Sequence, residues 1–395
     1  MHISLDSAIG QQRRLNQVGE TISSIAAPAA AYSLRSLTGG DPRVVRVRRE
    51  GDNGEQDFTV SEINSGALVD YINTNGVFAN TGYESFSNAS ASGFTASNTG
   101  SLGYAVSDLP DGTSGTAISV SFDISITNGS PSISLRDALN GGNRVSNFET
   151  YTTSGSKTIT LTATGSYAGV GFTEGDAPSN FTVSNFKILG DGFVETWYDQ
   201  SGNGNDFTQT TSGSQPKIVS SGSLLSDGIF FDGSNDKLTT SALYATNLSV
   251  FSAVKNDTSV RTANYMRFIY IAGSSNSFQM VRGGHSDIGK YLSKNTSFQA
   301  STAAFEHGTA NGTQLLSAIT TSSATTAFID GSSQSNSSEL LGAGNNTTTT
   351  LGARDDSLSS SFFEGSMREV IIYQSNETDN RVALETNINS HYSIF

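Results

Sequence analysis

Short segments of alternating apolar and polar residues recur along most of the chain. ISVSFDISI, KTITLTATG and NFTVSNFKIL alternate in this way before residue 190, and LSVFSAVKN, QLLSAITT and MREVIIYQ do so after it. Alternation with a period of two buries one set of side chains and leaves the other in solvent, so each segment predicts a β-strand. Glycine, asparagine and proline turns separate the segments, as is typical of β-sandwiches. The chain is therefore predicted to be all-β.

The alternating segments divide the chain into parts. Residues 72–189 carry their own strands and turns and are long enough to close as an independent jelly-roll-like sandwich. Residues 190–395 repeat the strand pattern. Residues 1–29 instead show a weak amphipathic pattern that Gly10 and Gly19 interrupt, which predicts a short arm that orders against a partner or a neighbouring subunit.

A few segments predict other local structure. AAAYSLRSLTGG carries a short helical signal with two glycines as its stop, and VVRVRRE predicts a strand. The C-terminal NETDNRVALETNINSHYSIF predicts a helix capped by Thr378. Glu364 and Glu369 lie five apart in one strand segment and are interpreted as solvent-exposed charges.

Composition and charge restrict the partners. Only 15% of the residues are charged, and the net charge of −14 argues against nucleic acid, whose phosphates need basic surface. Residues 1–50 nevertheless hold seven arginines against four acidic residues. The arm either docks on an acidic partner or is simply a locally basic stretch, and in the first case the candidate anchoring residues are Arg13, Arg14, Leu15 and Val18.

Several features that other protein classes need are missing from the sequence. It has no cysteine, so neither disulfides nor thiolate metal sites are expected. No apolar run approaches the length of about 18 residues that a membrane-spanning helix requires. The first twenty residues lack the apolar segment of a secretory signal peptide, which predicts that the protein is not exported by that route.

The most distinctive stretch is WYDQSGNGNDFTQ, and it resembles the signature of the α-L-arabinofuranosidase B catalytic domain. Two further pieces resemble that family in the same order: AAYSLRSLTGGDPRVVRVRREGDNGEQDF before the signature, and FFEGSMREVIIY with NRVALETNINSHY after it. The resemblance implies a concanavalin A-like sandwich made from residues 30–71 and 190–395. In the family only a short connection joins the first piece to the signature, so residues 72–189 are expected to be an insertion, with a likeness to carbohydrate-binding modules.

The resemblance also bears on activity, because a retaining glycosidase needs two carboxyl groups. The family's acid/base position falls on Asp355 or Asp356, but its nucleophile position falls on Arg267, which cannot attack an anomeric carbon. These residues are therefore interpreted as vestiges of a catalytic site. Trp197, Tyr198 and Asp199, with Arg267 and Asp356, are instead predicted to bind carbohydrate.

One loop offers oxygen ligands for calcium, although no cofactor is required by the sequence. Its candidate ligands are Asp199, Asn203, Asn205 and Asp206, and a second loop offers Asp232, Asn235 and Asp236. The alternative is that these residues only build tight turns, since Asp and Asn side chains bond to nearby backbone.

These observations favour a non-catalytic phage virion protein, such as a tail fibre or a capsid decoration protein. We expect it at the virion surface as a homo-oligomer, with a trimer favoured, anchored to other virion proteins by its arm and binding a host-surface glycan. An arabinofuranosidase-like polysaccharide depolymerase and a secreted bacterial lectin or adhesin, which would be extracellular, are the alternatives.

Overall fold

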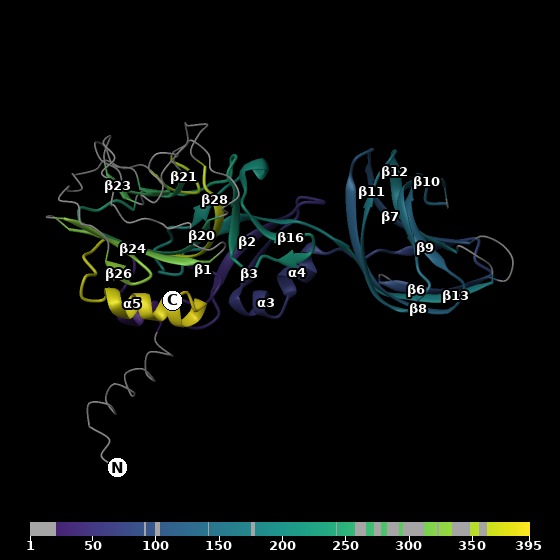
Figure 1. Ribbon diagram of the computed structural model, residues 1–395, viewed down its shortest axis with the longest axis horizontal. Helices are drawn as coiled ribbons and strands as arrows, with labels where there is room; N and C mark the ends of the chain where they lie inside the picture. Colours follow the sequence, from purple (N-terminus) through teal and green to yellow (C-terminus); the bar gives the residue numbers. More distant parts are fainter. Residues whose placement is uncertain are drawn as a thin grey trace, which may run out of the picture.

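The computed structural model describes residues 21–90, 92–98, 103–140, 142–174, 178–241, 243–256, 266–271, 278–282, 292–294, 312–321, 324–333, 348–354 and 362–395. The anchoring candidates Arg13, Arg14, Leu15 and Val18 lie outside these residues, as do Asp355 and Asp356. The described chain is dominated by antiparallel strands in two sandwiches, which confirms the predicted all-β class (Figure 1).

The larger sandwich, called the host sandwich here, has a front sheet whose strands pair in the spatial order β3, β2, β14, β16, β18, β28, β20, β24, β25, β26. Strand β1 pairs with β28 beyond β18, and β17 forms a hairpin with β16. The bounds are β1 (Ala30–Ser33), β2 (Arg43–Arg49), β3 (Glu55–Thr59), β14 (Gly192–Trp197), β16 (Lys217–Ser220), β17 (Ser223–Leu224), β18 (Ile229–Asp232), β20 (Leu248–Asn256), β24 (Gln314–Thr320), β25 (Thr325–Ile329), β26 (Ser332–Ser333) and β28 (Glu364–Tyr373).

A second layer of the host sandwich pairs in the order β15, β19, β27, β21, β22, β23. Its bounds are β15 (Phe207–Thr208), β19 (Leu238–Thr240), β21 (Met266–Ile271), β22 (Phe278–Arg282), β23 (Leu292–Lys294) and β27 (Thr349–Leu351). One continuous apolar core takes side chains from both layers, for example Val47 and Phe231 from the front and Phe268 and Met280 from the back.

The helices cover parts of the host sandwich. They are α2 (Ile22–Ile25), α3 (Val60–Asn64), α4 (Ala67–Ile72) and α5 (Arg381–Tyr392), with a 3-10 turn η1 at Ser212–Ser214. Helix α5 lies along the outer face of the front sheet (Figure 1), where Leu384 and Ile388 pack against Phe251, Ile371 and Tyr373. No helix among the described residues is both long and apolar enough to span a membrane.

The local predictions around these elements had mixed outcomes. The strand at VVRVRRE is confirmed as β2 and the C-terminal helix as α5, but its N-cap is Asn380 and not Thr378. The helix expected in AAAYSLRSLTGG is wrong, because Ala30–Ser33 forms strand β1. All four residues of β1 are fully buried and pair with β28, so tertiary pairing overrides a helical preference that was only local.

The smaller sandwich, the inserted sandwich, contains two five-stranded antiparallel sheets. Their orders are β10-β9-β12-β7-β4 and β11-β8-β13-β6-β5. The bounds are β4 (Phe78–Thr81), β5 (Ser85–Ser90), β6 (Gly93–Asn98), β7 (Tyr104–Gly112), β8 (Ala117–Asn128), β9 (Pro131–Arg136), β10 (Arg144–Thr150), β11 (Gly155–Thr162), β12 (Tyr167–Glu174) and β13 (Ser179–Leu189). These sheets enclose a second core, rich in phenylalanine, that shares no residue with the host core.

The chain enters and leaves the inserted sandwich at one place. Thr74 and Ile188 exchange backbone hydrogen bonds of 3.1 and 2.8 Å. The Asn73 side chain accepts from the Gly190 amide at 3.2 Å and donates to the Gly222 carbonyl at 3.1 Å, which ties both passages to the host. Figure 1 shows the inserted sandwich beyond this junction, at one end of the host.

Candidate functional site

A row of aromatic and cationic side chains crosses the front sheet of the host sandwich. The register places six residues opposite one another on six neighbouring strands: Arg48 (β2), Phe193 (β14), Lys217 (β16), Phe230 (β18), Ser366 (β28) and Lys255 (β20). We call this set the cross-strand row. Directly opposed residues of antiparallel strands lie on the same face of a sheet, so the six side chains form one band perpendicular to the strands.

The cross-strand row lies on the outer face because its chain neighbours fill the core. Val47 and Val194 are fully buried in the host core, and so are Ile229 and Phe231 on either side of Phe230. With a period of two, the residues between them point away from the core. Helix α5 packs on the outer face over β1, β20 and β24, and its apolar contacts include no residue of the row.

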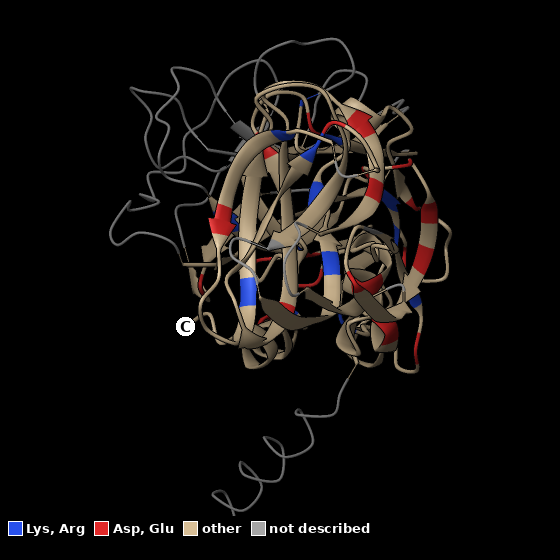
Figure 2. Cartoon of the chain, turned by 90° about the vertical axis from the view of Figure 1, so that its right-hand side faces the viewer, with Lys and Arg blue, Asp and Glu red and all other residues tan. Residues whose placement is uncertain are grey.

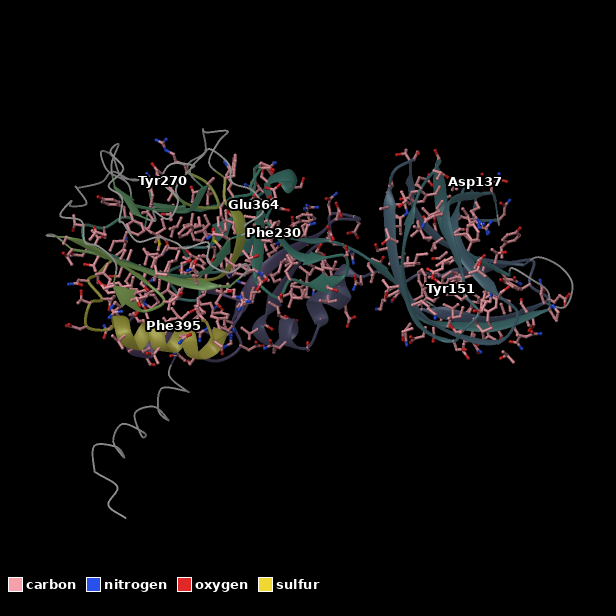
Figure 3. The ribbon with its side chains drawn as sticks, in the orientation of Figure 1. Asp137, Tyr151, Phe230, Tyr270, Glu364 and Phe395 are labelled. Carbon is pink, nitrogen blue, oxygen red and sulfur yellow. The ribbon has the colours of Figure 1, made fainter. Side chains whose placement is uncertain are left out.

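Two cavities lie along this row. The first has a volume of about 510 Å³ and is lined by Arg48, Phe193, Lys217 and Phe230, together with Glu50, Asn53, Ser212, Gly213, Gln215, Asp232 and Asp236. The second has about 390 Å³ and is lined by Leu225, Ser226, Asp227, Phe230, Lys255, Gly365 and Ser366. Phe230, labelled beside Glu364 in Figure 3, lines both cavities, so we treat them as one groove.

Arg48 occupies one end of the groove as a buried cation held by neutral groups. Its side chain donates to Gln215 Oε1 at 2.6 Å, Asn53 Oδ1 at 3.0 Å and the Ser212 carbonyl at 3.3 Å. The residue is 8% exposed, and within the described residues no carboxylate lies within 4.0 Å of its guanidinium. Its guanidinium carbon also lies 4.9 Å from the centre of the Phe193 ring, a cation–π distance.

The other two cations of the groove are held in ion pairs. Lys217 Nζ lies 2.5 Å from Asp191 Oδ2 and 5.4 Å from the centre of the Phe193 ring. Lys255 pairs with Asp227, which also receives Arg368 at 2.5 Å. Each pair keeps donors and acceptors side by side at the rim of an aromatic ring, an arrangement suited to a ligand that has both kinds of group.

Asp232 and Asp236 add two carboxyl groups to the first cavity. Asp236 is 7% exposed, and its Oδ2 accepts from the Asp232 amide at 2.9 Å. Asp232 Oδ1 accepts from the amides of Ser234 at 2.8 Å and Asn235 at 3.2 Å, which builds a tight turn after β18. Burial, and secondly the neighbouring Asp232 charge, raise the pKa of Asp236 to about 7. This carboxyl therefore titrates near neutrality.

The structure corrects the prediction for Trp197. Its side chain is fully buried against Tyr32 and Phe207, with ring centres 5.8 Å apart from Tyr32, and belongs to the host core. A ring without exposed surface cannot stack on a sugar. The sequence signature thus marks a packing position at the end of β14.

Tyr198 and Asp199 are engaged within the protein. The Tyr198 hydroxyl donates to Asp57 Oδ1 at 2.7 Å, and the Arg43 guanidinium lies 4.7 Å from the centre of its ring. Both Asp199 oxygens accept hydrogen bonds: Oδ1 from the Ala31 and Ser201 amides at 2.9 and 2.8 Å, and Oδ2 from the Asn205 amide at 3.0 Å. Neither residue lines the groove.

The calcium candidates lie in the loop that contains Asp199. Asp206 Oδ1 accepts from the Asp199 amide at 2.8 Å, and the side-chain amides of Asn203 and Asn205 donate to the Ala29 carbonyl at 3.1 and 2.9 Å. The loop is therefore held by Asx bonds, as in the turn alternative. Over the described ranges, no three His, Cys, Asp or Glu side chains gather in a way that could hold a metal ion.

The predicted vestigial catalytic site is not assembled by the described residues. Arg267 lies in β21, where its backbone is paired with Val281 in the second layer. Asp355 and Asp356 lie outside the described residues. Their predicted roles stay predictions.

The six residues of the cross-strand row were not identified from the sequence, although one signal was present. Phe230 and Phe193 stand between buried apolar neighbours in strands where a polar residue is expected on the solvent face. An aromatic residue on that face is a feature that a strand-by-strand analysis could have singled out.

Comparisons with known proteins give only distant structural likenesses. No protein-family model and no curated protein matches the chain. An arabinofuranosidase complexed with arabinofuranosyl-α-1,2-xylobiose aligns with 94% of this chain and 65% of its own, at 10% identity and a TM-score of 0.42. A GH54 α-L-arabinofuranosidase soaked with a cyclic sulfate inhibitor aligns with 70% of this chain and 62% of its own, at 12% identity and a TM-score of 0.37.

Sialidases are also among the similar structures. The Trypanosoma rangeli sialidase in complex with 2,3-difluorosialic acid aligns with 50% of this chain at 9% identity and a TM-score of 0.33. The match spans 31% of the sialidase chain. At TM-scores below 0.5 these likenesses carry no inference about the activity of this protein.

Proposed function

We propose that this protein is a glycan-binding β-sandwich protein and that the ligand lies in the groove along the cross-strand row. The observation that carries the proposal is the alternation of flat aromatic rings and polar side chains over two cavities that meet at Phe230. The C–H face of a sugar packs on an aromatic ring, and its hydroxyl groups both donate and accept hydrogen bonds.

The polar groups of the groove match that requirement. Each lysine is paired with an aspartate, so an ammonium donor and carboxylate acceptors lie beside each other. Arg48, held in place by three neutral acceptors, keeps further N–H groups for a ligand. Sites for small molecules combine an apolar surface with a few fixed polar groups in the same way.

For the biological setting we propose a virion-surface protein that displays this groove toward a host glycan and is anchored through residues 1–29. This part of the proposal is supported by the composition, the basic character of residues 1–50 and the serine- and threonine-rich strands. A homotrimer is the assembly we propose for such a fibre or decoration protein.

The groove assignment is tested by glycan-array screening followed by calorimetry on the purified full-length chain. Phe230→Ala is expected to weaken binding about tenfold or more, because the ring contributes on the order of 1.5–3 kcal/mol of buried apolar contact. Phe148→Ala is the matched control, since Phe148 is 51% exposed on the inserted sandwich. Equal losses in both variants, or binding unaffected by Phe230→Ala, would place the ligand elsewhere.

A polysaccharide depolymerase is the second candidate, and Asp236 is the observation that favours it. A carboxyl with a pKa of about 7 inside a groove is suited to general acid catalysis near neutral pH. If the protein is such an enzyme, it releases reducing sugar from a bound glycan, and Asp236→Asn abolishes the release while retaining binding. Unchanged glycan after long incubation with pure protein excludes this candidate.

A further inference from the structure

We infer that the groove binds the interior of a linear, uncharged polysaccharide chain that runs perpendicular to the strands of the front sheet. The inference rests on the proposed function and specifies its ligand. It distinguishes such a chain from two other kinds of glycan, a single terminal sugar and an acidic polymer.

The extent of the groove is the first reason. The cross-strand row spans six strands from Arg48 to Lys255, and neighbouring strands lie about 4.8 Å apart, so the row is roughly 24 Å long. The cavities of about 510 and 390 Å³ adjoin along it and share Phe230. A pocket for a terminal sugar would lie on one side of Phe230, whereas the two cavities lie on both sides of it along the row.

The repeat within the row is the second reason. Phe193 and Phe230 lie two strands apart, with Lys217 on the strand between them, and Lys255, paired with Asp227, follows two strands beyond Phe230. Apolar faces and paired charges therefore alternate along one line. A ligand that repeats a flat apolar face and a set of hydroxyl groups along its length matches this alternation, and a polysaccharide chain has that repeat.

Charge is the third reason. Asp191 pairs with Lys217, Asp227 is shared by Lys255 and Arg368, and Glu50 and Asp232 line the first cavity beside Arg48. The whole chain carries a net charge of −14. Figure 2 shows acidic and basic residues interspersed over the ribbon, seen from the side of the inserted sandwich. Among the described residues that line the groove, Arg48 is the one cation without a carboxylate partner, and the net negative charge of the chain repels a polyanion.

The experiment is a length series with neutral oligosaccharides: cello-, xylo-, manno- and laminari-oligosaccharides from the dimer upward, titrated into the full-length protein by calorimetry. Within the series that binds, the dissociation constant is expected to fall about tenfold or more as the chain grows to reach both sides of Phe230, and then to level off. Binding should be insensitive to added salt, because no net charge is neutralised.

Two variants test whether the gain in affinity with chain length depends on the ring of Phe230. Phe230→Ala is expected to remove the gain from chain length, so that a long oligosaccharide binds no better than a short one. Phe230→Leu keeps an apolar side chain between Lys217 and Ser366 and loses only the flat ring, which separates stacking from a folding defect. Thermal unfolding of both variants checks that the host sandwich is intact, with Phe148→Ala as the control.

The outcomes separate the inference from the proposed function. Equal affinity for short and long neutral chains, still lost in Phe230→Ala, overturns the interior-chain inference and leaves glycan binding standing. Tighter, salt-sensitive binding of pectate or alginate than of neutral chains does the same. Absence of binding to every neutral and acidic glycan overturns both.

Discussion

The two sandwiches of this chain are both built from short antiparallel strands, yet they bury different kinds of polar residue. The inserted sandwich encloses a cluster of phenylalanines in which Phe172 has four ring neighbours, Phe78, Phe94, Phe122 and Phe186, with ring centres 4.9–6.2 Å away. Its buried polar residues are mostly serines and threonines. Its stability therefore depends chiefly on aromatic packing.

The host sandwich instead buries carboxyl groups. Glu369 is fully buried and pairs with Arg35 through two hydrogen bonds of 2.7 and 2.8 Å, which links the segment after β1 to β28. Asp236, Asp330 and Glu385 are carboxyls whose pKa burial raises, and the described residues of the inserted sandwich include none of this kind. Burying ionisable groups costs free energy. The polar groups of the host sandwich therefore lower its free energy of unfolding relative to a sandwich with an apolar interior and outer face.

The largest expected effect on stability comes from a substitution in the aromatic core of the inserted sandwich. Phe172→Ala should lower the free energy of unfolding of that sandwich by about 4 kcal/mol, because it removes a fully buried ring and leaves a cavity. Differential scanning calorimetry should show one transition shifted down, while glycan binding in the host groove persists. Phe148→Ala, at an exposed site, should cost at most about 0.5 kcal/mol. An equal shift of every transition would show that the two cores unfold together.

The next effect tests the buried ion pair of the host. Glu369→Ala should cost about 3 kcal/mol, because it leaves the guanidinium of Arg35 buried without its carboxylate. The measurement is urea unfolding followed by Trp197 fluorescence, since this is the single tryptophan and it lies in the host core. Asp52→Ala removes an exposed partner of Arg49 and should cost less than about 1 kcal/mol. Similar costs for the two variants would contradict the claim that the host depends on this buried ion pair more than on an exposed one.

The smallest effect concerns pH. The folded state holds the Asp236 proton with a pKa of about 7, against 3.8 in an unfolded chain, so stability from this group is present at low pH and declines as pH rises from about 4 to about 7. Asp236→Asn should remove that decline. Relative to the unmodified protein, its free energy of unfolding should rise by on the order of 2–3 kcal/mol between pH 4 and pH 8, a figure that allows for water entry into the groove. Urea unfolding at both pH values measures it. A pH dependence identical to that of the unmodified protein would contradict the shifted pKa.

The local pattern of the sequence was sufficient for the fold class and for several elements. Period-two alternation depends only on neighbouring residues, so the strands and the all-β class could be predicted without knowing any pairing. The C-terminal helix was predicted for the same reason, although its start at Arg381 was not. Glu369 shows the limit: its position in a strand segment suggested a solvent-exposed charge, and its burial is explained by partners from distant segments, Arg35 and Tyr392.

Only the tertiary structure decided the candidate site. The cross-strand row draws on six strands between Arg48 and Ser366, and its side chains meet because of the register between strands, which is fixed by pairing over long sequence separations. The same pairing buried Trp197, the residue that the sequence signature made most conspicuous. A sequence determines what each residue can do locally, but which residues face the same groove depends on closing the whole sandwich around one core.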